Sequence, residues 1–308
     1  MSELEKSLPP AAEPEDDHDG MLRMSFMDHL EELRSRLLKA IAGLGVGFAA
    51  AIYFANDLWT LVKAPAQAAC LQNKIESCLV ATGPTEGFTI LWVKLPLLAS
   101  IFLSSPWILY QVWAFISPGL YKNERKWALP FVLFSAGLFI LGGAFAYFVA
   151  FRLGLGFLLS ITVSGGITSL LSITEYFDLF VNVSLGMGLV FEIPIIIFFL
   201  ALLKIVTAGF LLRNSRYAIL IIVVIAAILT PTPDVVNLML IAGPMTILYF
   251  GGVFAAYVLT LHRENKQFPW YILFGILAVF LLLIAAGVYL AVSRYGYQIV
   301  PGYPFLIK

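Results

Sequence analysis

Long apolar runs separated by short charged segments dominate the hydropathy pattern of this chain. Seven runs are expected to form helices, at residues 37–57, 88–116, 128–150, 178–203, 217–231, 235–260 and 269–292. They are continuous rather than alternating, and about as long as the ~20 residues that a helix needs to cross a bilayer. Because hydrocarbon offers no water to unpaired backbone groups, only helices or a closed barrel can span it. The pattern predicts an all-α integral membrane protein, a polytopic helical bundle.

The fifth run is short and is followed by the sequence Thr230-Pro-Thr-Pro-Asp234. Pro231 and Pro233 deny backbone donors and should end the helix. The fifth and sixth runs are therefore expected to form a shallow hairpin that does not cross the full bilayer. Asp234 is expected to cap the sixth helix through its carboxylate.

Composition agrees with a membrane protein and narrows the chemistry. Of the 308 residues, 60% are hydrophobic and 12% charged, whereas a soluble domain carries about 25% charged residues. His18, His29 and His262 are scattered, so no metal site is expected. The sequence contains no phosphate loop, dinucleotide fingerprint or nucleophile elbow. We expect no cofactor and no enzymatic activity.

The first twenty residues are acidic, with seven carboxylates against the single base Lys6. This is the reverse of a cationic leader, so no removable signal peptide is expected. Three prolines also fall in this stretch. Residues 1–22 are predicted to form a disordered cytoplasmic tail.

The distribution of lysine and arginine predicts the orientation. One set of alternate segments holds twelve: Arg23, Arg34, Arg36, Lys39, Lys122, Arg125, Lys126, Lys204, Arg213, Arg216, Arg263 and Lys266. The other set holds six: Lys63, Lys74, Lys94, Arg152, Arg294 and Lys308. We expect a cytoplasmic N-terminus and, after seven crossings, an outer C-terminus.

Cys70 and Cys78, the only two cysteines, fall in the first outer loop. Seven residues separate them, which allows a disulfide in an oxidising compartment. Two independent thiols are the alternative. In either case the pair would be structural and not reactive.

The segment from Met27 to Leu37 places five charges and a histidine just before the first apolar run. Its apolar residues recur at helical spacing, which is suited to a helix lying in the interface before the chain turns into the bilayer. Glu32 and Arg36 are four residues apart in the favourable order for an ion pair. An ordinary amphipathic helix with internal ion pairs explains the pattern equally well.

Two further polar features interrupt the apolar pattern. Residues 118–126 form a charged loop that, taken alone, is explained by exposure to solvent. Glu192 lies inside the fourth run, where an ionisable group costs several kcal/mol by order of magnitude and rarely faces lipid. Pro194 can open the helix ladder beside it. A polar cavity around Glu192 is therefore expected.

Taken together, these features resemble the TatC family, the multispanning subunit of the twin-arginine protein translocase. The matching stretches are His29–Leu37, Ser105–Lys126, Phe191–Pro194 and Thr230–Asp234. They follow in the family order, and the resemblance covers about residues 25–262. It implies a concave core of six helices, over residues 23–262.

The resemblance implies that the cytoplasmic face binds signal peptides with paired arginines, carried by folded cargo proteins. Glu32 and Glu124 match the family's signal-binding carboxylates, and Phe115 matches an aromatic residue beside them. A guanidinium pairs with carboxylates through planar, often bidentate hydrogen bonds that lysine cannot copy. Arg34 is expected to orient the acidic residues of the first segment.

Glu192 matches the family's intramembrane carboxylate, which implies docking of single-span TatA or TatB-type subunits within a larger, homo-oligomeric complex. The resemblance also implies a bacterial cytoplasmic (inner) membrane protein whose transport is driven by the proton-motive force. Many members carry a glutamine four positions after Asp234. This chain has Leu238 there, and Asn237 is expected to substitute at the docking site.

Residues 263–308 depart from the family, whose core ends after six spans. The run at 269–292 is long enough to cross, with Arg263 and Lys266 before it and tyrosines after it. We expect an additional transmembrane helix followed by an outer tail.

Two other classes of function compete with this interpretation. A mid-membrane glutamate beside a proline is also typical of a proton-coupled carrier of small solutes. The chain lacks the pair of broken helices in corresponding halves that such a carrier would have. An intramembrane enzyme is disfavoured, because no serine–histidine or paired-aspartate arrangement falls within the runs.

Overall fold

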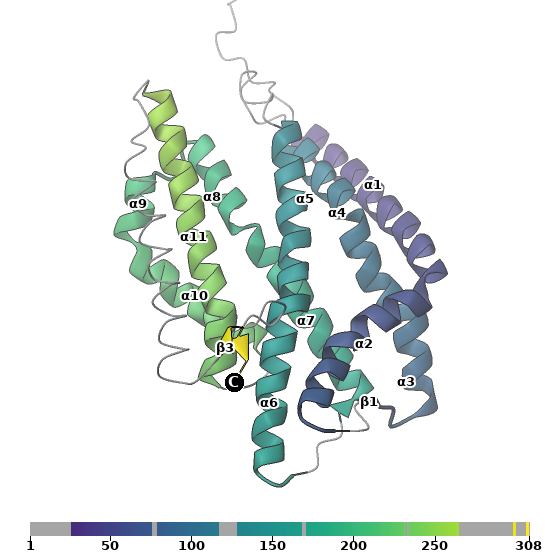
Figure 1. The fold of residues 1–308 in the computed structure, drawn as a ribbon. Coiled ribbons are helices and arrows are strands. Elements are labelled where there is room, and N and C mark those ends of the chain that lie inside the picture. The colour runs from purple at the N-terminus through teal and green to yellow at the C-terminus, as the bar shows by residue number, and fades with distance from the viewer. Residues whose placement is uncertain are drawn as a thin grey trace, which may run out of the picture. The chain divides into compact units, whose positions relative to one another are not determined.

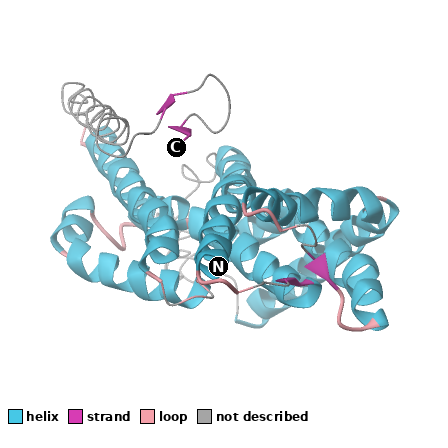
Figure 2. Cartoon of the chain, turned by 60° about the horizontal axis from the view of Figure 1, so that its bottom comes forward, coloured by secondary structure: helices cyan, strands magenta, loops and turns pink. Residues whose placement is uncertain are grey.

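Helices make up almost all of the described chain (Figure 2). The computed structural model describes residues 26–75, 79–116, 128–167, 171–230, 232, 234–264, 298–299 and 306–307. The predicted acidic tail and the predicted seventh helix lie outside these ranges. Within them the all-helical prediction is confirmed.

The elements follow one another along the chain as Figure 1 labels them. They are α1 (Phe26–Tyr53), α2 (Ala55–Gln72), β1 (Leu79–Val80), α3 (Pro84–Thr89), the π-helical turn η1 (Ile90–Lys94), α4 (Leu95–Ile116), α5 (Ala128–Phe145), the π-helical turn η4 (Ala146–Ala150), α6 (Phe151–Ser164), β2 (Leu171–Ser172), α7 (Ile173–Phe191), α8 (Ile193–Leu202), α9 (Ala208–Arg213), α10 (Ser215–Leu229), α11 (Val235–Arg263), β3 (Gln298–Ile299) and β4 (Leu306–Ile307). Strands β1 and β2 pair in parallel, and β3 and β4 pair antiparallel. The chain divides into two compact units, Met1–Ala256 and Tyr257–Lys308. The contacts described below lie within the first unit.

Five helical segments in the described ranges are long and apolar enough to cross a membrane. They are Met27–Tyr53, Pro84–Ile116, Pro130–Ser164, Ile173–Leu202 and Val235–Arg263. Helix α10 is apolar but shorter. Six of the seven predicted runs thus correspond to observed helices. The third is longer than predicted, because α5 continues through η4 into α6.

The first helix corrects one expectation. Residues 26–53 form a single α-helix of 28 residues, with no turn between the charged segment and the apolar run. No proline falls within this stretch, so the backbone hydrogen-bond ladder continues through the change in polarity. The charged segment is therefore an extension of the first spanning helix and not a separate interfacial helix.

The predicted shallow hairpin is half correct. Helix α10 has 15 residues, which is about 22 Å at 1.5 Å per residue and less than a hydrocarbon core of about 30 Å. Helix α11 has 29 residues, or about 43 Å. The expectation that both helices are shallow is wrong for α11, which is long and apolar enough to cross a membrane.

Helices α1 and α4 pack side by side along most of their length (Figure 1). Ser104 Oγ donates a hydrogen bond to the carbonyl of Gly43, at 3.0 Å. The indole Nε1 of Trp107 donates to the carbonyl of Lys39, at 2.8 Å. A Cβ on Gly43 would lie 2.2 Å from the Trp107 ring, so only glycine fits there. We call this contact the α1–α4 seam.

Helix α2 crosses one end of the bundle and is tied to η4 and α7 by tyrosines (Figure 1). Tyr176 donates from its hydroxyl to the carbonyl of Val62 at 2.6 Å, and Tyr147 donates to the carbonyl of Leu61 at 3.0 Å. Cys70, also in α2, is buried and disulfide-bonded. Cys78 lies outside the described residues, so the bond between these two cysteines stays a prediction.

Helices α5 and α7 cross closely because glycines lie at the contact. A Cβ on Gly142 would lie 2.4 Å from the backbone oxygen of Met187, and one on Gly188 would lie 2.8 Å from the Phe139 ring. Small residues let the backbones of membrane helices approach in this way. This crossing fixes α5 against the segment that leads into Glu192.

Replacing Gly142 should therefore separate the two helices. We expect Gly142→Ala to lower the free energy of unfolding by about 2 kcal/mol, because the new methyl group meets rigid backbone. Gly137→Ala in the same helix is the matched control, since a Cβ there meets nothing within 4 Å. Its effect should stay within about 1 kcal/mol. Denaturation in mixed micelles measures both values, and equal losses would contradict the close crossing.

Candidate functional site

The beginning of α1 and the end of α4 meet in a cluster of polar and aromatic side chains. The imidazole of His29 stacks on the ring of Phe115, with centroids 4.5 Å apart and planes at 24°. Phe115 is half-buried. Residues 29, 32 and 36 lie on one face of α1, because they are separated by three and four positions. That face points toward α4.

Glu32 has only one of its carboxylate oxygens paired. Arg36 Nη2 donates to Glu32 Oε1 at 3.3 Å, and Arg36 Nη1 donates to Gln111 Oε1 at 3.5 Å. Both distances exceed the 2.7–2.9 Å that is typical of a charge-assisted hydrogen bond. The other oxygen, Glu32 Oε2, is buried and has no hydrogen-bond partner among the described residues. One carboxylate oxygen is thus weakly paired, and the other is buried without a partner among the described residues.

A cavity of about 380 Å³ opens beside this carboxylate. Among the described residues, its lining comes from α1 and consists of Asp28, Glu31, Glu32, Ser35, Arg36 and Lys39. Three of these six residues are acidic and two, Arg36 and Lys39, are basic. The arrangement suits a cationic ligand that places its charge next to Glu32.

The role expected of Arg34 stays a prediction. Arg34 is exposed and forms no ion pair within the described part of the chain. Arg34 is two residues after Glu32, so its side chain lies on the opposite face of the helix. Arg36 is four residues after Glu32 and lies on the same face. Arg36 is the arginine that contacts this carboxylate among the described residues. Glu124 lies outside the described residues.

Two members of the cluster, Gln111 and His29, are not evident from the sequence. Gln111 is 2% exposed, and sequence reasoning gives His29 no contact with Phe115. An isolated amide inside an apolar helix is a signal for Gln111, because a buried amide needs a partner. The described ranges contain no group of three or more histidine, cysteine or acidic side chains that could hold a metal ion.

Glu192 lies at a break in the fourth spanning segment. Helix α7 ends at Phe191, α8 begins at Ile193, and Pro194 occupies the first turn of α8. This agrees with the expected opening of the helix ladder by Pro194. Ser135 Oγ on α5 donates to Glu192 Oε2 at 2.5 Å. Glu192 Oε1 is buried and has no hydrogen-bond partner among the described residues.

Asp234 caps α11, as the sequence predicts. Its Oδ1 accepts from the backbone N–H of Asn237 at 2.7 Å, and its Oδ2 accepts from Thr232 Oγ1 at 2.5 Å. Asn237 also donates from its side chain to Asp234 Oδ2 at 2.9 Å, and it is 6% exposed. The amide thus has a structural role in the cap, and the docking role expected of it stays a prediction. Pro231 and Pro233 lie outside the described residues.

Comparison with known proteins identifies similar sequences and structures. A family model described as the Sec-independent protein translocase protein TatC matches residues 28–244. The TatC protein of Koribacter versatilis is 40% identical over 261 residues, covering 85% of this chain and 94% of that protein. The TatC protein of Escherichia coli K12 is 40% identical over 229 residues, covering 74% and 86%. A crystal structure of the twin-arginine translocase receptor TatC has a TM-score of 0.65 at 36% identity, covering 74% of this chain and 99% of that one.

The pair formed by Ser135 and Glu192 gives a test of the buried site. Ser135→Ala removes the hydrogen-bond donor and leaves a buried carboxylate, so we expect a loss of about 1–3 kcal/mol in the free energy of unfolding. In the background of Glu192→Leu the same change should cost much less, because no buried acceptor remains. A double-mutant cycle in micelles measures the difference. A cost of Ser135→Ala that is the same in both backgrounds would contradict the contact.

Proposed function

Because the chain belongs to the TatC family of Sec-independent protein translocase subunits, we propose that Glu32 and Glu124 bind the paired arginines of twin-arginine signal peptides. The protein is a multispanning membrane subunit of the twin-arginine translocase, a transport receptor and not an enzyme. This membership removes the carrier of small solutes as an alternative. The proposal concerns which residues bind the signal and how.

The half-paired carboxylate of Glu32 is the observation that carries the proposal. A guanidinium has five N–H donors in a planar fork, and a carboxylate with a vacant oxygen accepts one or two of them. The long contacts from Arg36 leave Glu32 open to a better-placed donor. A lysine ammonium has no planar fork and would gain less at this site. Selection of arginine follows from that difference.

The short connection between α4 and α5 supports a role for Glu124 in the same region. Glu124 lies eight residues after Ile116 and four before Ala128, so it stays within about 14 Å of the start of α5. Helices α4 and α5 are in contact near these ends, where the rings of Trp113 and Phe131 lie 3.9 Å apart. A second carboxylate from this loop would pair with the second arginine, so the two arginines are read by two different segments.

Phe115 would contact the apolar residues of the signal. Its ring is half-buried and its position is fixed by the stack with His29. We propose that the protein lies in the inner membrane of a bacterium and that this site faces the cytoplasm. The distribution of lysine and arginine predicts this orientation. Cargo that is still on the cytoplasmic side then meets the carboxylates first.

Glu192 would serve a different partner. Its Oε1 lacks a hydrogen-bond donor within the described chain, and a buried acceptor of this kind gains from a polar group brought by another helix. We infer that single-span subunits of the TatA or TatB type dock here, in a homo-oligomeric complex driven by the proton-motive force. Glu32 and Glu192 thus have separate roles in binding the signal and the partner.

Crosslinking of signal peptides in membranes tests the signal site. We expect an Arg-Arg peptide to label the chain and a Lys-Lys peptide to label it weakly. Glu32→Gln and Glu124→Gln should each reduce labelling by the Arg-Arg peptide about tenfold or more, since each removes a charge-assisted hydrogen bond. Glu31→Gln is the matched control, because Glu31 is exposed and lines the same cavity. Its labelling should stay near that of the unchanged chain.

Other outcomes would contradict the proposal. Equal labelling by both peptides would show that the site reads charge and not arginine. Equal losses from Glu31→Gln and Glu32→Gln would show that the acidic cavity acts through its total charge. Either result would remove the half-paired carboxylate as the basis of recognition.

A further inference from the structure

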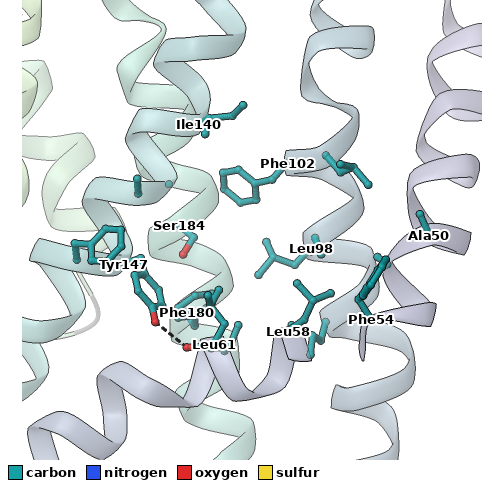
Figure 3. A pocket seen from close by; sticks show the side chains of 18 residues that line it. Ala50, Phe54, Leu58, Leu61, Leu98, Phe102, Ile140, Tyr147, Phe180 and Ser184 are labelled. Carbon is teal, nitrogen blue, oxygen red and sulfur yellow. Dashed lines mark hydrogen bonds between the residues drawn. The ribbon is translucent and has the colours of Figure 1, made fainter. Parts of the chain in front are cut away.

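A large apolar cavity lies between α1, α2, α4, α5 and α7, away from the site around Glu32. Its volume is about 630 Å³. The lining is apolar except for the hydroxyls of Tyr147 and Ser184, and Figure 3 shows these two side chains near one wall. The Tyr147 hydroxyl is already bonded to the carbonyl of Leu61. The cavity therefore suits a hydrocarbon occupant.

The cavity has the length of a short stretch of hydrocarbon. Its lining runs along α4 from Leu95 to Leu103 and along the α5–η4 segment from Ile140 to Phe148, which is about 12 Å in each case.

One side of the cavity is open and the other is closed. Phe54, Leu103 and Phe148 on its rim are 52%, 61% and 62% exposed, whereas Leu98 and Phe180 on its floor are 5% exposed. In a membrane-spanning protein, exposed apolar side chains on the spanning helices face hydrocarbon. Side chains of α2 line one end of the cavity (Figure 3). The bilayer thus has direct access, and an unfilled apolar space would forfeit contacts on every wall.

We propose that this cavity binds an acyl chain of a membrane phospholipid, which enters sideways from the bilayer. The proposal is independent of signal-peptide binding, because no residue of the lining belongs to the site around Glu32. Ser184 provides a way to distinguish an acyl chain from a polar ligand. Its Oγ is buried without a hydrogen-bond partner among the described residues, and an acyl chain neither needs nor uses it.

The experiment uses the full chain in lipid nanodiscs that contain a phospholipid with a photoreactive group in its acyl chain. Mass spectrometry then locates the labelled residues, which we expect at Phe102 and Tyr147 in the cavity. The double variant Ala99→Phe and Ala144→Phe fills the lumen, and labelling there should fall about tenfold. Ala49→Phe is the matched control, because Ala49 is exposed on α1 and outside the cavity lining. Neither this control nor Ser184→Ala should change the labelling.

Three results would overturn the proposal. The first is labelling of the unchanged chain that is no stronger in the cavity than on exposed helix faces. That result would show that the cavity contacts lipid in the same way as any other exposed surface and is not a binding site. Undiminished labelling in the filled variant would place the lipid elsewhere. Loss of labelling in Ser184→Ala would mean that the occupant needs a hydrogen bond and is not a simple acyl chain. The distribution of labels on the unchanged chain decides the matter even if the filled variant does not fold.

Discussion

Helix α1 is held against α4 by side-chain contacts between its residues 29 and 43, from the hydrogen bonds of Ser104 and Trp107 to the α1 backbone to the stack of His29 on Phe115. The candidate signal site depends on this contact. Hydrogen bonds from side chains to backbone carbonyls fix both the rotation and the height of α1, because each carbonyl points in one direction. With the register set in this way, Glu32 lies beside Arg36 and Arg36 lies beside Gln111. Among the described residues, the carboxylate consequently has one paired oxygen and one without a partner.

The same constraint acts on polar groups deeper in the helices. Hydrocarbon gives no partner to an isolated carboxylate, so Glu192 needs a donor from within the protein. Ser135 supplies one donor for one oxygen, and the close crossing at Gly142 brings α5 near enough to α7 to allow it. Both Glu32 and Glu192 are thus acceptors that the described chain satisfies only in part. A receptor and docking subunit gains from such groups, because each partner completes a hydrogen bond that the free protein lacks.

Local patterns in the sequence predict much of this structure, and contacts between distant segments explain what they miss. Hydropathy locates six of the helices, and the spacing of Asp234 before α11 predicts its cap. Spacing also predicts the ion pair between Glu32 and Arg36. The sequence alone does not show whether Arg36 or Arg34 orients the acidic side chains. Gln111 and Ser135 could not be placed, since their partners lie 75 and 57 residues away along the chain.

The central claim is that Glu32 selects arginine through its vacant oxygen, and a double-mutant cycle tests it most directly. The free energy of peptide binding is measured for the unchanged chain and for the Glu32→Gln variant, each with the Arg-Arg and the Lys-Lys peptide. The account predicts a coupling free energy of about 1.5 kcal/mol or more between Glu32 and the arginines. A coupling within about 0.3 kcal/mol of zero would contradict it, because Glu32 and arginine would then act independently.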